Sequence, residues 1–140
     1  MDFYYLYDII ISIKGKNMYY INDKEYKCTV AVTLDIFNDR WKLAIIWHLL
    51  DGDKRFKELH ETISEITQKT LTIKLKELEE KNIINREVFA QIPPKVVYSL
   101  TPCGKNLRAV LENMNKWGID YAQEFGKITS QNQCETKICE

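Results

Sequence analysis

Residues 67–100 constrain the fold of this chain more than any other stretch. The first part of the stretch carries leucines at helical spacing, and the second part carries two apolar runs, residues 83–90 and 95–100, on either side of Pro93-Pro94. Prolines cannot donate the hydrogen bonds of a strand ladder, so this pair belongs at the tip of a two-stranded ribbon. A helix followed by such a ribbon predicts an α+β fold, the winged helix-turn-helix.

The helix that follows Thr67 is predicted to have two different faces. Leu71, Leu75 and Leu78 fall on one side at positions i, i+4 and i+7, which suits packing. The polar residues that fall nearly opposite can enter the major groove of DNA, and they are Gln68, Lys69, Thr72 and Lys76. Thr67 suits the N-cap, because its hydroxyl can satisfy a free amide of the first turn, and we expect it at the same interface. A solvated lysine face is the alternative.

The ribbon supplies the context for this helix. In its second run Val96, Tyr98 and Leu100 alternate with other residues, which is the period-2 pattern of a strand with one buried face. Lys95 begins the run beside the ribbon tip, where a wing would meet DNA phosphates. Arg55, at the start of an earlier predicted helix, is the second residue that we expect to meet phosphates.

Four further helices are expected, at residues 30–37, 40–50, 55–63 and from Thr101 to the glycine at 126. The second of them is apolar almost all round, which predicts a central buried helix. The third and the helix after Thr67 are joined by a tight turn, which makes a helix-turn-helix. The last opens with threonine as cap and proline at the first position.

The last helix carries an apolar stripe that is longer than a small domain can cover. We expect it to form the seam of a homodimer, with packing inside one chain as the alternative. The residues assigned to the dimer interface are Leu107, Leu111, Met114, Trp117, Tyr121 and Phe125.

Composition limits the classes of function. The chain has 20 basic and 20 acidic residues, so only a local patch can support binding to nucleic acid. We expect no signal peptide, because the start lacks a basic region, and the apolar run at residues 3–13 is too short to span a bilayer. The expected parts are an N-terminal extension (1–27) that could join the dimer contact, a winged-helix domain (28–126) and a flexible tail (127–140). Whether residues 1–17 belong to the native protein stays open.

The cysteines favour a reducing compartment. Cys28, Cys103, Cys134 and Cys139 form no C-x-x-C pair and have no histidine at zinc-ligand spacing. We therefore expect no metal, no cofactor and no disulfide framework, and reduced thiols in the cytoplasm. A tail cysteine could still serve Cys28 as a resolving thiol.

Cys28 itself precedes a predicted helix, where unpaired amides and the helix dipole favour an anion. Lys27 adds a positive charge beside it. Both favour the reactive thiolate, which predicts a redox sensor. A buried, inert cysteine is the alternative.

Three stretches together resemble the HxlR family of bacterial winged-helix transcription regulators, relatives of the MarR group: LDIFNDRWKLAIIWHLLDGDKRFKEL, TLTIKLKELEEKNIINREVF and IPPKVVYSLTPCG. The resemblance covers about residues 26–122. It implies a homodimer that binds an inverted-repeat operator, and in several members a thiol ahead of the first helix senses electrophiles or oxidants. Cys28 occupies that place. Cys103 departs from the family pattern.

We therefore expect a dimeric, sequence-specific, DNA-binding transcriptional regulator, a repressor that releases double-stranded DNA when Cys28 is modified. One alternative is a regulator that responds to a non-covalent small ligand, and another is a winged helix used for protein contacts without DNA binding. We expect no enzyme, because His48 and His60 offer no recognisable pairing with Cys28.

Overall fold

The computed structural model describes residues 18–21 and 23–126 of the 140-residue chain. The chain divides into two compact units, Met1–Asp39 and Arg40–Glu140. The expectations for residues 1–17 and for the tail, with Cys134 and Cys139, lie outside the described residues. No helix in the described part is long and apolar enough to cross a membrane.

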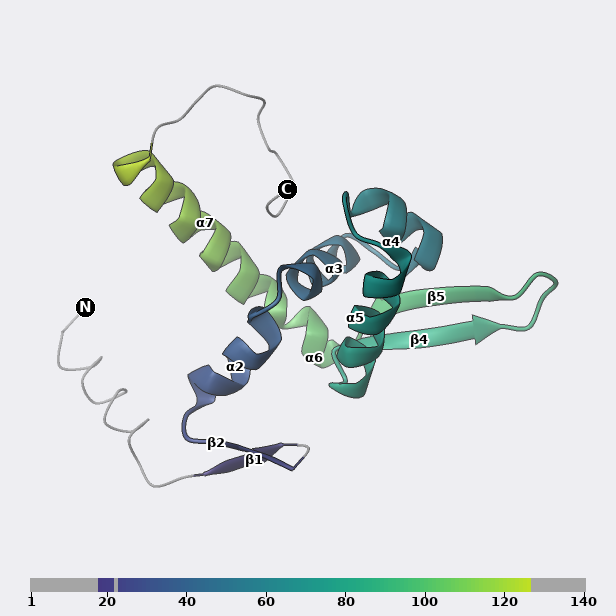
Figure 1. The fold of residues 1–140 in the computed structure, drawn as a ribbon, viewed down its shortest axis with the longest axis horizontal. Coiled ribbons are helices and arrows are strands. Elements are labelled where there is room, and N and C mark those ends of the chain that lie inside the picture. The colour runs from purple at the N-terminus through teal and green to yellow at the C-terminus, as the bar shows by residue number, and fades with distance from the viewer. Residues whose placement is uncertain (1–17, 22, 127–140) are drawn as a thin grey trace. The chain divides into compact units, whose positions relative to one another are not determined.

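In the described part of the N-terminal unit, a small hairpin is followed by a helix (Figure 1). Strands β1 (Tyr19–Ile21) and β2 (Lys24–Tyr26) pair antiparallel, and helix α2 spans Thr29–Phe37. The hydroxyl of Tyr26 donates to Asp35 Oδ2 at 2.9 Å, and Lys24 forms an ion pair with the same carboxylate. These bonds hold β2 against α2. The helix begins one residue earlier than the predicted range of 30–37. The compact unit Met1–Asp39 includes this helix.

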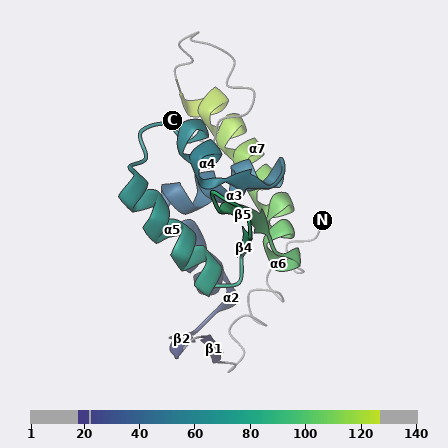
Figure 2. The same cartoon turned by 90° about the vertical axis from the view of Figure 1, so that its right-hand side faces the viewer.

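The C-terminal unit is a winged helix-turn-helix, as predicted. Its elements in chain order are α3 (Arg40–Leu50), β3 (Lys54–Arg55), α4 (Phe56–Thr62), α5 (Gln68–Glu80), β4 (Ile84–Phe89), β5 (Lys95–Leu100), α6 (Pro102–Lys105) and α7 (Leu107–Phe125). In Figure 2, α5 lies on one side of this unit and α6 on the other, with β4 and β5 between them.

Helix α3 forms the centre of the unit, which confirms its prediction as a buried helix. It contacts α4, α5, α7 and β5. The largest fully buried side chains come from α3, α4, α5 and β4, and they are Ile45, Ile46, Leu59, Leu71, Leu75, Leu78 and Ile84. The two helices of the helix-turn-helix are therefore held by one apolar core.

The sheet has three antiparallel strands in the order β3-β5-β4. The ribbon runs from the pair Ile84 and Leu100 at its base to the pair Phe89 and Lys95 near its tip. Strand β3 was not predicted, and Arg55 does not begin a helix: it ends β3, opposite Val97, and α4 starts one residue later. A strand of two residues is too short to show an alternating pattern in sequence.

A hydrogen-bonded corner joins the base of the ribbon to α6. The hydroxyl of Thr101 donates to the carbonyl of Asn82 at 2.7 Å and accepts from the amide of Gly104 at 3.0 Å. A Cβ at Gly104 would lie 2.2 Å from the carbonyl oxygen of Ile83, so the corner requires glycine. The continuous last helix that we predicted is divided into α6 and α7 at Asn106, whose amide is shared between the carbonyls of Pro102 and Cys103.

Candidate nucleic-acid interface

Helix α5 presents one packed face and one exposed face. Leu71, Leu75 and Leu78 are buried against α3 and β4, as predicted. The four polar residues assigned to the groove are all exposed on the same helix, and they are Gln68, Lys69, Thr72 and Lys76. The structure therefore places these four together on the side that packing leaves open.

The threonines of α5 serve the backbone. The hydroxyl of Thr67 accepts from the amide of Thr70 at 3.1 Å, which confirms Thr67 as the N-cap. The hydroxyl of Thr72 donates to the carbonyl of Gln68 at 2.8 Å. The side chains of Gln68 and Lys69 are thus the ones in the first turn that can reach furthest from the helix. Lys69 has no acidic partner within the part of the chain that the structure describes.

Two other lysines of α5 have acidic neighbours. Lys76 lies 3.8 Å from Glu80, and both side chains are well exposed, so this pair stabilises little and leaves the ammonium accessible. Lys74 instead lies on the inner side and pairs with Glu77 at 3.2 Å. Of the three lysines between Thr67 and Lys76, Lys69 and Lys76 therefore form the exposed basic stripe.

A partly buried ion pair, which sequence reasoning missed, fixes α5 to α3. The Nζ atom of Lys42 lies 2.9 Å from Glu77 Oε2, and the Lys42 side chain is only 9% exposed. The bond to Lys42, together with that to Lys74, lowers the pKa of Glu77 below its ordinary value of 4.5. A lysine in an otherwise apolar helix was the available signal for a buried partner.

Arg55 and Lys95 lie on the same face of the three-stranded sheet. Arg55 stands opposite Val97, and Lys95 stands opposite Phe89, two residues along the same strand from Val97. The Nζ atom of Lys95 lies 5.3 Å from the centre of the Phe89 ring. Both basic residues assigned to phosphate contacts are thus on the ribbon sheet, whereas the groove residues are on α5.

Cys28 is the N-cap of α2. Its Sγ atom accepts a hydrogen bond from the amide of Ala31 at 3.4 Å, and the residue is half-buried. The sulfur thus satisfies one of the free amides of the first turn of α2. Cys103 is exposed at the start of α6.

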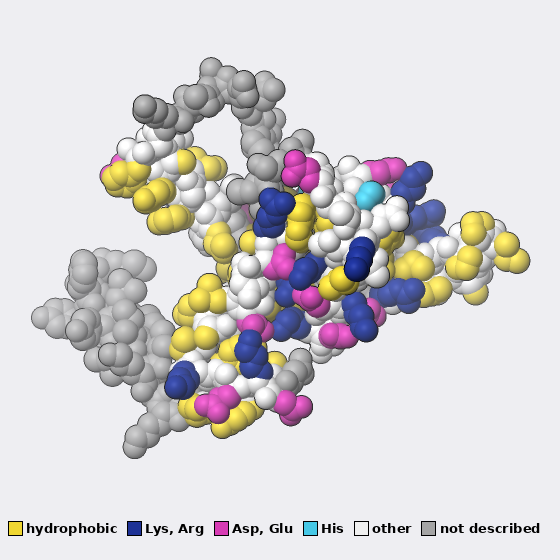
Figure 3. Space-filling view, viewed as in Figure 1, with side chains coloured by type: hydrophobic (Ala, Val, Ile, Leu, Met, Phe, Trp, Pro, Cys, Tyr) yellow, Lys and Arg dark blue, Asp and Glu magenta, His cyan; other side chains and the backbone are white. Residues whose placement is uncertain are grey.

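Helix α7 leaves most of its apolar stripe uncovered. Leu111 is buried within the chain and Leu107 is half-buried, so these two contribute mainly to packing inside the unit. The exposed remainder consists of Met114, Trp117, Tyr121 and Phe125, beside Val110. The rings of Trp117 and Tyr121 stack with centres 5.0 Å apart, and Phe125 follows at 4.9 Å from Tyr121. Figure 3 shows apolar side chains along this helix.

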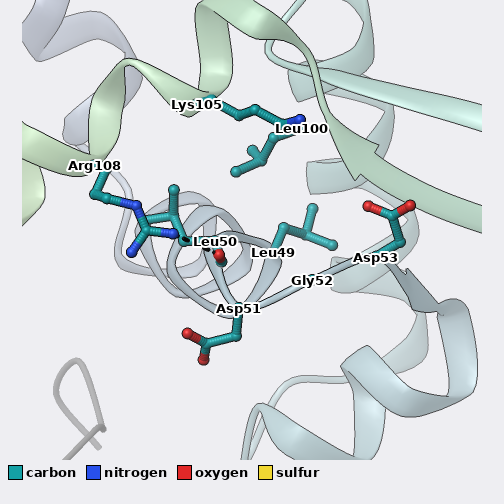
Figure 4. Close-up of a pocket in the computed structure, with 8 residues that line it drawn as sticks. All are labelled: Leu49, Leu50, Asp51, Gly52, Asp53, Leu100, Lys105 and Arg108. Carbon is teal, nitrogen blue, oxygen red and sulfur yellow. Dashed lines mark hydrogen bonds between the residues drawn. The ribbon is translucent and has the colours of Figure 1, made fainter.

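A pocket lies where α7 begins beside the end of α3 (Figure 4). Arg108 reaches from α7 and donates through Nη2 to the carbonyl of Leu50 at 2.7 Å. Asp51, Asp53 and Lys105 also line the pocket. The bond from Arg108 caps α3 and joins α7 to the loop that leads into β3 and the helix-turn-helix. Among the described residues, no group of three acidic, histidine or cysteine side chains could hold a metal.

The order of the elements, the basic face of α5 and the antiparallel wing define a winged helix-turn-helix protein. A model of the HxlR-like helix-turn-helix family matches residues 36–125. The chain belongs to this family, which confirms the resemblance found in the sequence. Its curated relatives are named as transcriptional regulators, and the chain is likewise a transcriptional regulator and not an enzyme.

The relatives include proteins of Bacillus subtilis (strain 168). The HTH-type transcriptional regulator YdeP is 43% identical over 119 residues, which cover 85% of this chain and 93% of YdeP. The regulator YodB is 44% identical over 98 residues, or 70% of this chain and 88% of YodB. Among solved structures, the oxidized form of the redox regulator HypR has a TM-score of 0.62 and 44% identity, covering 66% of this chain and 96% of HypR.

Proposed function

We propose that this regulator binds an inverted-repeat DNA operator as a homodimer. Helix α5 enters the major groove with Gln68, Lys69, Thr72 and Lys76, while Arg55 and Lys95 contact phosphates. The observation that carries this proposal is the exposed, basic, acid-free first half of α5, whose opposite face is fixed in the core. Only such a local patch can attract DNA in a chain of zero net charge.

The test uses DNA fragments selected by the protein from genomic DNA. Fluorescence anisotropy at moderate salt should show about a hundredfold weaker binding for the Lys69→Glu, Lys76→Glu double variant. The matched control is Lys105→Glu, Lys116→Glu, which makes the same charge change on α6 and α7. Unaltered affinity in a folded Lys69→Glu, Lys76→Glu variant would contradict the assignment. No retention of duplex by the wild type would instead favour a winged helix that contacts protein.

The roles of individual residues can be separated by salt and by sequence. Lys95→Ala should weaken binding to every sequence about equally and reduce the salt slope by about one, because it removes one phosphate contact. Gln68→Ala should cost about 1 to 3 kcal/mol on the selected site alone, because a base contact is specific.

The dimer proposal rests on the uncovered aromatic row of α7. Trp117 is 67% exposed and Phe125 is 68% exposed in the single chain. Rows of large aromatic side chains are typical of interface centres, and a second copy of the same helix offers a matching apolar surface. The inverted-repeat operator follows from the twofold symmetry of such a dimer.

Cys28 is proposed as the switch that releases DNA under oxidants or electrophiles. The bond from Ala31 to its sulfur supports the proposal, as does the similarity to structures named for the oxidized redox regulator HypR and for diamide-treated YodB. Operator binding should fall after diamide treatment of the wild type and of Cys103→Ser, but not of Cys28→Ser. Equal loss in all three proteins would exclude Cys28, and loss in none would favour a non-covalent ligand.

A further inference from the structure

The outer end of the wing carries exposed apolar side chains and no charge. From Val88 to Pro94 the sequence has no acidic or basic residue. Ile92 is fully exposed, at 102%, and Val88 and Phe89 are also exposed. Figure 3 shows this group as the apolar end of the projecting ribbon. Neighbouring apolar side chains held out in water are typical of a contact surface.

We propose that Ile92, at the tip of this wing, selects A·T pairs in the minor groove of DNA. The inference rests on the proposed function, because it takes α5 as the element in the major groove. It adds a second position at which the protein distinguishes base pairs. This contact is made by an apolar side chain, whereas Arg55 and Lys95 are assigned to phosphates.

The ribbon has the length that this role requires. Strands β4 and β5 contain six residues each, so the ribbon extends about 20 Å beyond its base at the usual rise per residue. The next minor groove lies about half a helical turn, or roughly 17 Å, from the centre of the major groove. A ribbon that leaves the end of α5 can therefore reach it. The minor groove is only about 6 Å wide, which admits a single narrow tip.

The charges along the ribbon complement a groove with phosphate walls. Lys95 lies just below the tip, opposite Phe89, and Arg86 lies further down β4. Glu87 is the acidic residue of this ribbon, and it stands opposite Val97, between Arg86 and the outermost pair. On β5 the charge next to the uncharged end is therefore the positive charge of Lys95, which suits an apolar tip beside a phosphate row.

The chemistry of the groove floor explains the preference for A·T pairs. Both orientations of an A·T pair present only acceptors in the minor groove, whereas a G·C pair adds the guanine N2 amino donor. The Ile92 side chain offers no acceptor, so it would strip water from that amino group without replacing the hydrogen bond. Pro93 and Pro94 restrict the backbone beside Ile92, which limits the entropy lost when the tip becomes ordered.

The experiment replaces base pairs at the wing position of a selected operator. An A·T pair is changed to G·C, or to inosine·cytosine, which lacks the N2 amino group but keeps the major-groove atoms of G·C. Wild-type affinity should fall about tenfold with G·C and return to within about twofold with inosine·cytosine. Ile92→Ala should bind the three operators within about twofold of one another. Ile73→Ala is the matched control, because Ile73 is an exposed isoleucine on α5 and its loss should leave the discrimination intact.

Three results would overturn the proposal. Inosine·cytosine as weak as G·C would place the discrimination outside the minor groove. Full discrimination by Ile92→Ala would remove Ile92 from the contact. Equal affinity of the wild type for all three operators would make the tip a surface for another partner. In each case the wild type still binds DNA, so the proposed function stands, whereas a wild type that binds no duplex would end both proposals.

Discussion

Helices α5 and α7 both carry an apolar stripe, but the chain itself covers only one of the two. In α5, Leu71, Leu75 and Leu78 are at most 2% exposed, because α3 and β4 pack over them. In α7, Leu111 is buried near the start, while Trp117 and Phe125 remain mostly exposed. An apolar stripe therefore identifies a helix face that is expected to be buried. Whether the same chain buries it depends on how far the helix extends beyond its domain.

The strongest test of this difference is truncation on the packed helix. Leu75→Ala should lower the free energy of unfolding by about 2 to 5 kcal/mol, because it leaves a cavity between α5 and α3. Urea denaturation followed by circular dichroism measures the change. Ile73→Ala on the exposed side of the same helix should cost less than about 1 kcal/mol. Similar losses for both variants would mean that α5 is not held by one face.

Charge placed on the uncovered helix should affect association instead of folding. Trp117→Glu should raise the dissociation constant of the proposed dimer at least about a hundredfold, because central aromatic residues carry much of the binding energy of an interface. Sedimentation velocity at micromolar concentration measures it, with Lys116→Glu as the control one residue away. A wild type that is already monomeric, or a Trp117→Glu variant of unaltered mass, would contradict the dimer through α7.

The packing of α5 also has a polar component. Lys42→Met removes the buried partner of Glu77, and we expect a loss of about 1 to 2 kcal/mol because Lys74 and water still contact the carboxylate. Lys57→Met is a suitable control, since Lys57 is well exposed and its ion pair with Glu61 is weak. A loss no larger than that of the control would show that apolar contacts alone orient α5.

The smallest expected effect depends on pH. Because its lysine partners lower the pKa of Glu77, its contribution is complete above about pH 4.5 and is lost as the pH falls through the lowered pKa. The stability difference between wild type and Glu77→Gln should therefore be constant from about pH 7 to pH 5 and shrink below that range. Urea midpoints at intervals of pH measure it. A difference that persists unchanged to about pH 2.5 would contradict the assignment.

Local signals in the sequence were sufficient for most of the fold. The bounds of α3 follow from its apolar run, and Thr67 was recognisable as a cap because capping depends on neighbouring residues only. The exposed residues of α5 were also predictable, since helical periodicity places them opposite three leucines. These features are determined within a few turns of chain.

The missed features depend on contacts between distant residues. Lys42 and Glu77 are far apart in sequence, and only the packing of α5 on α3 brings them to 2.9 Å. Strand β3 exists because β5 lies beside it. Leu111 shares the spacing of the dimer stripe, and its burial follows from its place near the start of α7, where the domain still covers the helix. The periodicity of the sequence cannot show at which residue the domain stops burying the apolar face of α7.

The corner formed by Thr101 and Gly104 has a mechanical consequence for the proposed dimer. Thr101 bonds the backbone just before β4, and α7 follows the short helix that Thr101 caps. The hydrogen bonds of Thr101 thus join the base of the wing to the segment that leads into α7. Inserting one base pair between half-sites shifts one of them by about 3.4 Å and turns it by about a tenth of a revolution. We expect that two protomers joined through α7 cannot both stay in register when one half-site is displaced in this way. Such a dimer would therefore discriminate operators by the spacing of their half-sites as well as by their bases.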